Sequence, residues 1–231
     1  MTQAKIKTKE PPSLVEHSTL SRLRAKKRGK TANKILATAT EMFAETGFGG
    51  STMDELCSRS GVNKASIYYH FGDKAGLYEV ALTELFKSVV EPVLKTVAQA
   101  QGSRNQLHAF IESFAQQASL TPTMPAVLMR EIASGGMNMP IAAREQMQRL
   151  LFALKVILQQ GEEDGIFKES DPLTTHFMIL GSLCLFITSE PMRLAIPAEK
   201  KLDLSLDETI QQLTSMVEAA LLIANKEDEN V

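Results

Sequence analysis

Residues 51–74 read STMDELCSRSGVNKASIYYHFGDK, and this stretch decides the fold that the sequence predicts. The hydroxyl of Ser51 or Thr52 can accept a hydrogen bond from an orphan backbone N–H, so a helix is expected to begin here. Gly61 suits the left-handed backbone that ends many helices, because it has no Cβ to clash. The apolar face of this first helix has the spacing i, i+3 and i+4. It consists of Met53, Leu56 and Cys57.

A second short helix is predicted to begin near Asn63, after the turn at Gly61. Its inward set is predicted to be Ile67, Tyr68 and Phe71. Two helices joined by a turn of three or four residues that contains Gly form a helix-turn-helix. In that motif the second helix enters the major groove of DNA.

The segment GVNKASIYYHFGDKAGLY, residues 61–78, resembles the recognition-helix signature of the tetracycline-repressor (TetR/AcrR) family of bacterial regulators. The chain departs from that signature at Asn63, where Ser is common, and at Gly76, where Glu often follows the Lys. Neither difference touches the aromatic core of the motif. Residues 37–52, which include MFAETGFGGST, resemble the first helix of the family and its loop. The resemblance covers roughly residues 31–80, about a fifth of the chain.

The outward face of the second helix is predicted to read DNA, because its side chains can bond to base edges and phosphates. Lys64 can donate to guanine or phosphate, Ser66 can donate or accept, and Tyr69 can meet a thymine methyl group or a phosphate. The resemblance adds the residue at the start of the first motif helix and a Lys phosphate clamp at the start of the next helix. The predicted DNA-binding residues are Thr52, Asn63, Lys64, Ser66, Tyr69, His70 and Lys74. For Tyr69 and His70 the alternative is an ordinary solvated helix face.

Charge is distributed unevenly along the chain, although the formal total is only −2. Residues 1–30 carry nine Lys or Arg against two Glu, a balance of +7, whereas residues 75–231 sum to −8. A basic arm beside a helix-turn-helix favours attraction to phosphates. The alternative is a tail that only improves solubility.

Helical periodicity runs through the whole chain, and no strand alternation competes with it. The predicted fold class is all-α with about nine helices: an N-terminal three-helix helix-turn-helix domain and a larger C-terminal helical domain. A long helix is expected from Lys74 to about Gln99, with a kink or break near Val89 to Pro92, because Pro removes a backbone bond. The predicted domains are a basic, flexible arm at 1–29, a DNA-binding domain at 30–76 and a C-terminal domain at 77–231.

The resemblance implies that the C-terminal domain binds a ligand and forms the dimer. Its last two helices, Pro172 to Ser189 and Ser205 to Ala224, are expected to pair with those of a second copy, because the first of them is apolar nearly all round. Flexible Met side chains and aromatic rings suit an apolar pocket, although ordinary core filling is the alternative. The predicted ligand-binding residues are Phe110, Phe114, Met129, Met147, Leu151 and Phe177.

Enzymatic classes are disfavoured, because the four histidines show no HExxH spacing and the chain has no GxSxG, Gly-rich phosphate loop or CxxC. No metal site and no cofactor are predicted. The longest apolar run, Phe177 to Ile187, is shorter than the ~18–20 residues that a membrane helix needs, and no signal peptide is recognised. Cys57 and Cys184 suggest no disulfide framework, which fits a reducing bacterial cytoplasm.

The sequence therefore predicts a cytoplasmic, homodimeric transcriptional regulator without membrane partners. It is expected to repress transcription from a roughly palindromic operator until a small, largely apolar effector releases it. The alternative is a DNA-binding regulator without a small-molecule effector, controlled by a protein or acting constitutively.

Overall fold

The computed structural model describes residues 29–196 and 204–223, so nearly all of the predicted arm, residues 1–29, lies outside the described residues. The helices in chain order are α2 (Lys30–Gly50), α3 (Met53–Ser60), α4 (Lys64–Phe71), α5 (Lys74–Gln99), α6 (Ser103–Leu120), α7 (Thr123–Ala133), α8 (Ile141–Glu163), α9 (Pro172–His176), a π-helical turn η2 (Phe177–Gly181), α10 (Ser182–Thr188), α11 (Glu190–Leu194) and α12 (Leu206–Leu221). Within these ranges the only β-type pairing is an isolated bridge between Phe167 and Leu222. The predicted all-α class is confirmed.

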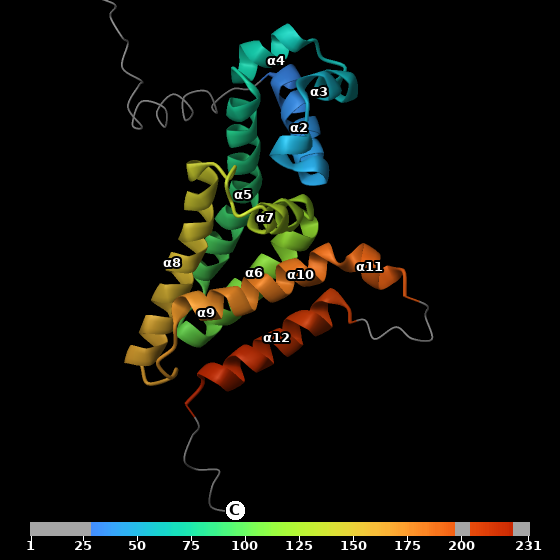
Figure 1. Cartoon of the computed structure of the whole chain (residues 1–231). Coiled ribbons are helices and arrows are strands. Elements are labelled where there is room, and N and C mark those ends of the chain that lie inside the picture. The colour runs from blue at the N-terminus through green and yellow to red at the C-terminus, as the bar shows by residue number, and fades with distance from the viewer. Residues whose placement is uncertain (1–28, 197–203, 224–231) are drawn as a thin grey trace, which may run out of the picture.

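The helices form two bodies that α5 connects (Figure 1). We call α2, α3 and α4 the head, and the helices from α6 to α12 the base. The N-terminal half of α5 packs on α2 and α4, and its C-terminal half packs between α6 and α8. None of the helices in the described ranges is long and apolar enough to cross a membrane.

The helix α2 is interrupted at Gly47. This residue has φ 71° and ψ −179°, a conformation that a residue with a Cβ rarely adopts. Ser51 then turns back, and its hydroxyl donates to the Gly47 carbonyl oxygen at 2.6 Å. The core of the head contains Ile35, Phe43 and Leu56, which are almost fully buried.

The helix α5 passes through Pro92 without a break, so of the kink or break predicted near Val89 to Pro92 the break does not occur. A proline inside a helix costs about 3 kcal/mol or more. Val89, Val90 and Val93 around it are fully buried, and each such burial contributes roughly 1.5–3 kcal/mol. Tertiary packing of the valines therefore outweighs the lost hydrogen bond.

The base is closed by α12, which lies across α6. Its start has the capping box that the sequence indicates, in which Ser205 and Glu208 each satisfy a backbone N–H of the other. Glu218 on α12 accepts hydrogen bonds from Arg104 and His108 of α6, both at 2.6 Å. These bonds fix the rotation of α12 on the base.

The predicted helix Pro172 to Ser189 is present as the consecutive segments α9, η2 and α10, which we call the rod. Asp171 caps its start, since its carboxylate accepts the Thr174 N–H at 2.7 Å. The rod buries one face that includes Ile179, Leu180 and Leu183. The short helix α11 follows it and has no counterpart in the sequence prediction.

His176 lies on the buried face of the rod and is only 7% exposed. Its Nδ1 has no hydrogen-bond partner among the described residues. Burial lowers the pKa of His176 to about 4, because the interior disfavours the imidazolium.

The free energy of unfolding is therefore expected to decrease as the pH falls, and part of this decrease should depend on His176. An unfolded His has a pKa near 6.5, so below that pH the unfolded state gains a proton that the folded state takes up only near pH 4. Between pH 7 and pH 5 this difference removes about 2 kcal/mol of the free energy of unfolding. Chemical denaturation at both pH values should show this loss in the parent and a smaller one in His176→Leu. An equal loss in both proteins would contradict the assignment.

Candidate nucleic-acid interface

The two motif helices are set by local capping bonds. Thr52 caps α3 by accepting the Glu55 N–H at 3.1 Å, and Asn63 caps α4 by accepting the Ser66 N–H at 2.8 Å. Between them, Gly61 has φ 62° and donates its N–H to the Cys57 carbonyl at 2.9 Å. Thr52 and Asn63, both in the predicted DNA-binding set, therefore also hold the motif in shape.

The helix α4 packs its apolar face against the rest of the head and exposes its opposite face to solvent. Ile67 is fully buried and Phe71 is 7% exposed, whereas Tyr69 is 84% exposed. The ring of His70 packs edge-on against that of Tyr69, with centroids 5.1 Å apart. Lys64 is also exposed. The predicted outward residues are therefore together on one surface of the head, with Ser66 and His70 at its partly buried margin.

Tyr68 was predicted to point inward, and the structure shows that this is wrong, because its side chain is 44% exposed. Ile67 and Phe71 are four residues apart and share the buried face. Tyr68 lies about 100° from Ile67 and about 60° from Phe71, which puts it at the edge of that face. The same spacing in the sequence was the signal that could have placed Tyr68 outside. It joins Tyr69 as a second exposed aromatic ring on α4.

Lys64 is not free in this structure. Its Nζ donates to the Asp54 carboxylate of α3 at 2.8 Å, and this hydrogen bond raises the pKa of Lys64 above its usual value. The Asp54 side chain is 81% exposed, so the pair lies in water and is readily exchanged. A phosphate or base that binds Lys64 must replace Asp54, a competitor that the sequence analysis did not identify.

Lys74, the predicted phosphate clamp, is less accessible than the α4 residues. Its ammonium group lies 4.5 Å from the centroid of the Phe48 ring, and Asp73 caps the helix immediately before it. Lys74 therefore lies at the start of α5, in contact with Phe48 of α2. Its role as a clamp stays a prediction.

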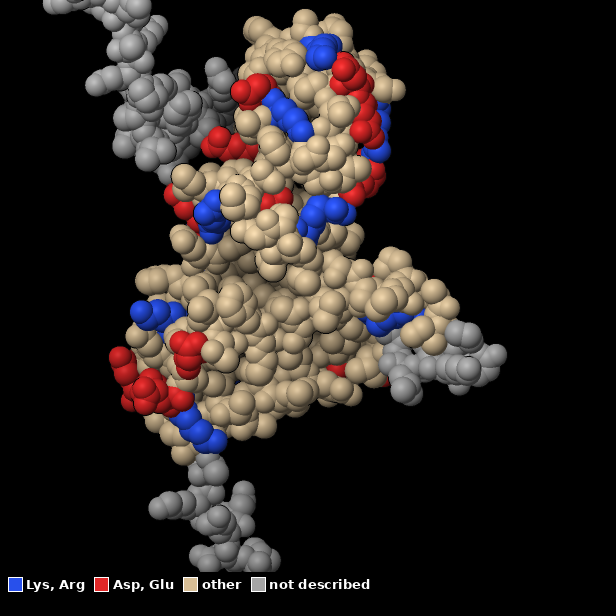
Figure 2. Space-filling view, viewed as in Figure 1, with Lys and Arg blue, Asp and Glu red and all other residues tan. Residues whose placement is uncertain are grey.

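The head has no continuous basic surface on the face that Figure 2 shows, where acidic and basic side chains are interspersed. Arg59 is one of the basic residues and is engaged by Glu45 at 2.5 Å and by Glu55 at 2.7 Å. Residues 31–74 sum to −1 in charge. Attraction to a polyanion must therefore come largely from elsewhere in the chain.

The predicted ligand-binding residues do not converge on one opening. Phe110 and Phe114 are fully buried in α6, Met129, Met147 and Leu151 are partly buried, and Phe177 is 61% exposed on the rod. None of them lines either of the two best-formed surface grooves of the described residues. Their assignment to a ligand stays a prediction.

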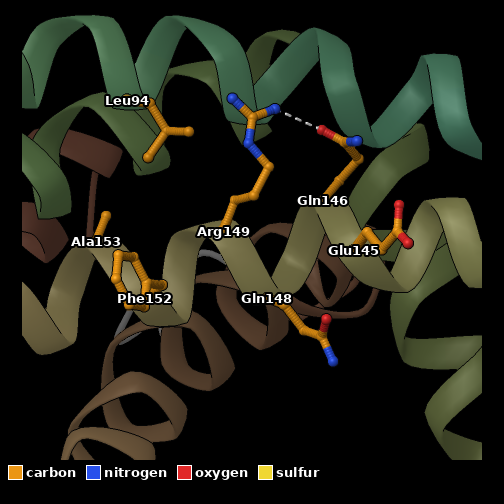
Figure 3. A pocket seen from close by; sticks show the side chains of 7 residues that line it. All are labelled: Leu94, Glu145, Gln146, Gln148, Arg149, Phe152 and Ala153. Atoms are coloured by element: carbon orange, nitrogen blue, oxygen red, sulfur yellow. Dashed lines mark hydrogen bonds between the residues drawn. The ribbon is translucent and has the colours of Figure 1, made fainter.

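The larger groove, about 680 Å³, lies between α5 and α8 (Figure 3). Apolar contacts come from Leu94, Phe152 and Ala153, and the polar rim includes Arg149. Arg149 donates to Glu91 at 2.6 Å and to Gln146 at 2.8 Å. The described residues contain no group of three or more potential metal ligands.

Residues 35–81, which cover most of the head and the start of α5, match the model of the bacterial regulatory proteins of the tetR family. The chain is 26% identical over 175 residues to the HTH-type transcriptional repressor NicS of Pseudomonas putida, a match that covers 72% of this chain and 80% of NicS. It is 31% identical over 87 residues to the HTH-type transcriptional activator FasR of Mycolicibacterium smegmatis, covering 38% of this chain and 40% of FasR.

A solved structure extends the similarity to the base. The regulator FadR of Bacillus subtilis, in complex with stearoyl-CoA, superposes with a TM-score of 0.65 at 19% identity. The superposition covers 81% of this chain and 97% of FadR. At this identity the likeness concerns the fold alone.

Proposed function

We propose, from the premise that this chain belongs to the tetR family of bacterial regulatory proteins, a function as a repressor. A small, largely apolar effector would release this repressor from its operator. The chain is a DNA-binding transcriptional regulator. Repression, effector release, the dimer and the individual contacts below are the proposal.

The observation that carries the DNA contacts is the exposed face of α4. Two aromatic rings, Tyr68 and Tyr69, and the ammonium group of Lys64 lie on this face, while Ile67 and Phe71 anchor the opposite face. Aromatic rings and an ammonium group can contact thymine methyl groups, guanine edges and phosphates, so this surface suits a major groove. The caps at Thr52 and Asn63 keep α3 and α4 in place while it binds.

Repression is favoured over activation, because the match to a repressor covers more of this chain than the match to an activator. The match to the repressor NicS covers 72% of this chain, whereas the match to the activator FasR covers 38%. A match over most of the chain includes the base, which is the part that distinguishes regulators with similar heads. We also propose that the functional division lies near residue 76, with the head reading DNA and residues 77–231 sensing and dimerising.

The dimer is proposed to form through the rod and α12, which both pack on α6. Their solvent-facing sides carry apolar residues that no other described residue covers, including Phe177 at 61% and Met216 at 67% exposed. The exposed small residues Gly181, Ser182 and Ala219 allow the backbones of two copies to approach closely. Apolar patches of this kind on a folded domain are typical of subunit interfaces. Phe177 thus fits the dimer contact better than a ligand pocket.

The effector is proposed to bind the groove between α5 and α8. Leu94 and Phe152 provide apolar surface, and Arg149 can exchange Glu91 for an anionic group of the ligand. Stearoyl-CoA, the ligand in the FadR complex, joins an apolar chain to an anionic group. Because the groove touches α5, an occupant would press on the helix that carries the head. The alternative, a regulator without a small-molecule effector, predicts that the groove binds nothing.

Operator affinity should respond to Lys64 and Tyr69. Lys64→Ala and Tyr69→Ala are each expected to weaken operator binding by about 1–3 kcal/mol, because each removes a contact to a base or phosphate. Asp54→Asn should instead strengthen binding, since it frees Lys64 and removes a negative charge. Fluorescence anisotropy on an operator selected with the parent protein measures all three.

The matched control is Lys95→Ala, which removes an exposed lysine from the base end of α5. It should leave operator affinity unchanged. If Lys64→Ala and Tyr69→Ala both bound like Lys95→Ala, the α4 surface would not be the reading surface.

A thermal-shift screen over fatty acids, their CoA esters and aromatic compounds tests the effector. A compound at about 100 times its Kd should stabilise the protein by about 2.7 kcal/mol, which raises Tm by roughly 5–10 °C in a chain of this size. The same compound should lower operator affinity in the same concentration range. Ala153→Phe, which fills the groove, should remove both effects. Shifts that persist in this variant would place the site elsewhere, and no shift with any compound would favour the effector-free alternative.

A further inference from the structure

A second connection between head and base exists beside α5. The helix α7 packs on α2 of the head and on α10 of the rod, so α5 is not the only element that touches both bodies. The C-terminal turn of α7 makes the polar part of this contact, through Arg130 and Glu131.

Arg130 donates hydrogen bonds to two backbone carbonyls of α2, just before the kink at Gly47. Its Nε donates to the Ala44 carbonyl oxygen at 3.1 Å, and its Nη2 donates to that of Glu45 at 2.8 Å. These carbonyls lie two and three residues before Gly47, the one residue of α2 with non-helical backbone angles, so Arg130 braces the helix next to this kink. A Cβ at Gly47 would lie 3.1 Å from Cδ of Arg130, so the glycine also makes room for the arginine.

Glu131 makes the buried half of the contact. It is 2% exposed, and its Oε1 accepts a hydrogen bond from the Tyr78 hydroxyl at 2.5 Å. Burial, and then the hydrogen bond to Glu131, raise the pKa of Tyr78 above its usual value, so the phenol stays a donor. The Oε2 of Glu131 is buried without a hydrogen-bond partner among the described residues, so the bond from Tyr78 must be kept, and this restricts the relative position of α5 and α7.

The Tyr78 ring also contacts two aromatic rings of the head. It packs edge-on against Phe43, with centroids 4.6 Å apart, and against Phe48 at 4.9 Å. The other neighbour of Phe48 is the ammonium group of Lys74, the predicted phosphate clamp. A continuous path of contacts therefore runs from Glu131 on α7 through Tyr78 and Phe48 to Lys74.

We propose that Arg130 and Glu131 are positioning residues for DNA reading, which fix the orientation of the head on the base. The inference rests on the proposed function, because it assumes two heads that read two half-sites. One connection through α5 lets a head swivel about that helix, whereas a second connection off its axis prevents the rotation. The pair touches no DNA and acts through the separation and tilt of the two heads.

The test compares Arg130→Met with Arg144→Met. Both arginines are exposed, and both donate from Nε to a backbone carbonyl, but Arg144 bonds within the base, to Met139 at 3.0 Å. An operator is first selected with the parent protein, and its half-sites are then moved apart or together by one and two base pairs. Each base pair shifts a half-site by about 3.4 Å and turns it by about a tenth of a turn.

The parent and Arg144→Met should bind the selected spacing at least about tenfold more tightly than the altered spacings. Arg130→Met should lose most of this preference, to about threefold or less, mainly by binding the selected spacing more weakly. Arg130→Lys, which keeps a cation at the carbonyls, should restore part of it. Hydrogen exchange at the C-terminal turn of α2 should be faster in Arg130→Met than in Arg144→Met.

An unchanged spacing preference in Arg130→Met, with hydrogen exchange equal to that of Arg144→Met, would overturn the positioning role and leave DNA binding intact. Failure of the parent to select any DNA sequence would instead refute the proposed function, and the inference would fall with it. Because Arg130 is exposed, its replacement should leave the fold intact, which the melting curve of each variant checks.

Discussion

The burial of α5 at both of its ends is the constraint on which the rest of this structure depends. Its first turns close the core of the head through Leu77 and Tyr78, and its later turns supply Val89, Val90 and Val93 to the base. Each of these side chains is at most 2% exposed, so the helix is fixed in both bodies at once. Head and base are therefore coupled along α5, and the contact of α7 with α2 restricts rotation about that helix. A displacement of α5 in the base, by a ligand or a partner, must move the head or break one of the two cores.

Local chemistry in the sequence was enough to predict the motif. The caps at Thr52 and Asn63 and the left-handed turn at Gly61 depend on side chains within a few residues, and the structure has all of them. Features that depend on distant residues were missed or predicted wrongly. Pro92 stays helical because the base encloses its neighbours, and Arg130 and Glu131 find partners 53 or more positions away in the chain. No periodicity within α7 could indicate that its end docks on α2.

Electrostatics distinguishes the proposed DNA-reading surface from the part of the chain that is expected to attract DNA. Residues 31–74 sum to −1, and Lys64 of the head is held by Asp54, so the structure offers shape and hydrogen-bonding groups more than net attraction. The balance of +7 in residues 1–30 lies almost wholly outside the described residues. A regulator built in this way would gain sequence preference from α4 and general affinity for phosphates from the basic arm.

The central proposal is that two heads, each held by α5, read two half-sites on one face of a duplex. Hydroxyl-radical footprinting of the selected operator, with the mass of the complex from sedimentation, tests it most directly. The account predicts two protomers on each duplex and two protected patches centred about one helical turn, 34–36 Å, or a multiple of it apart. A single protected patch with one bound protomer would contradict it.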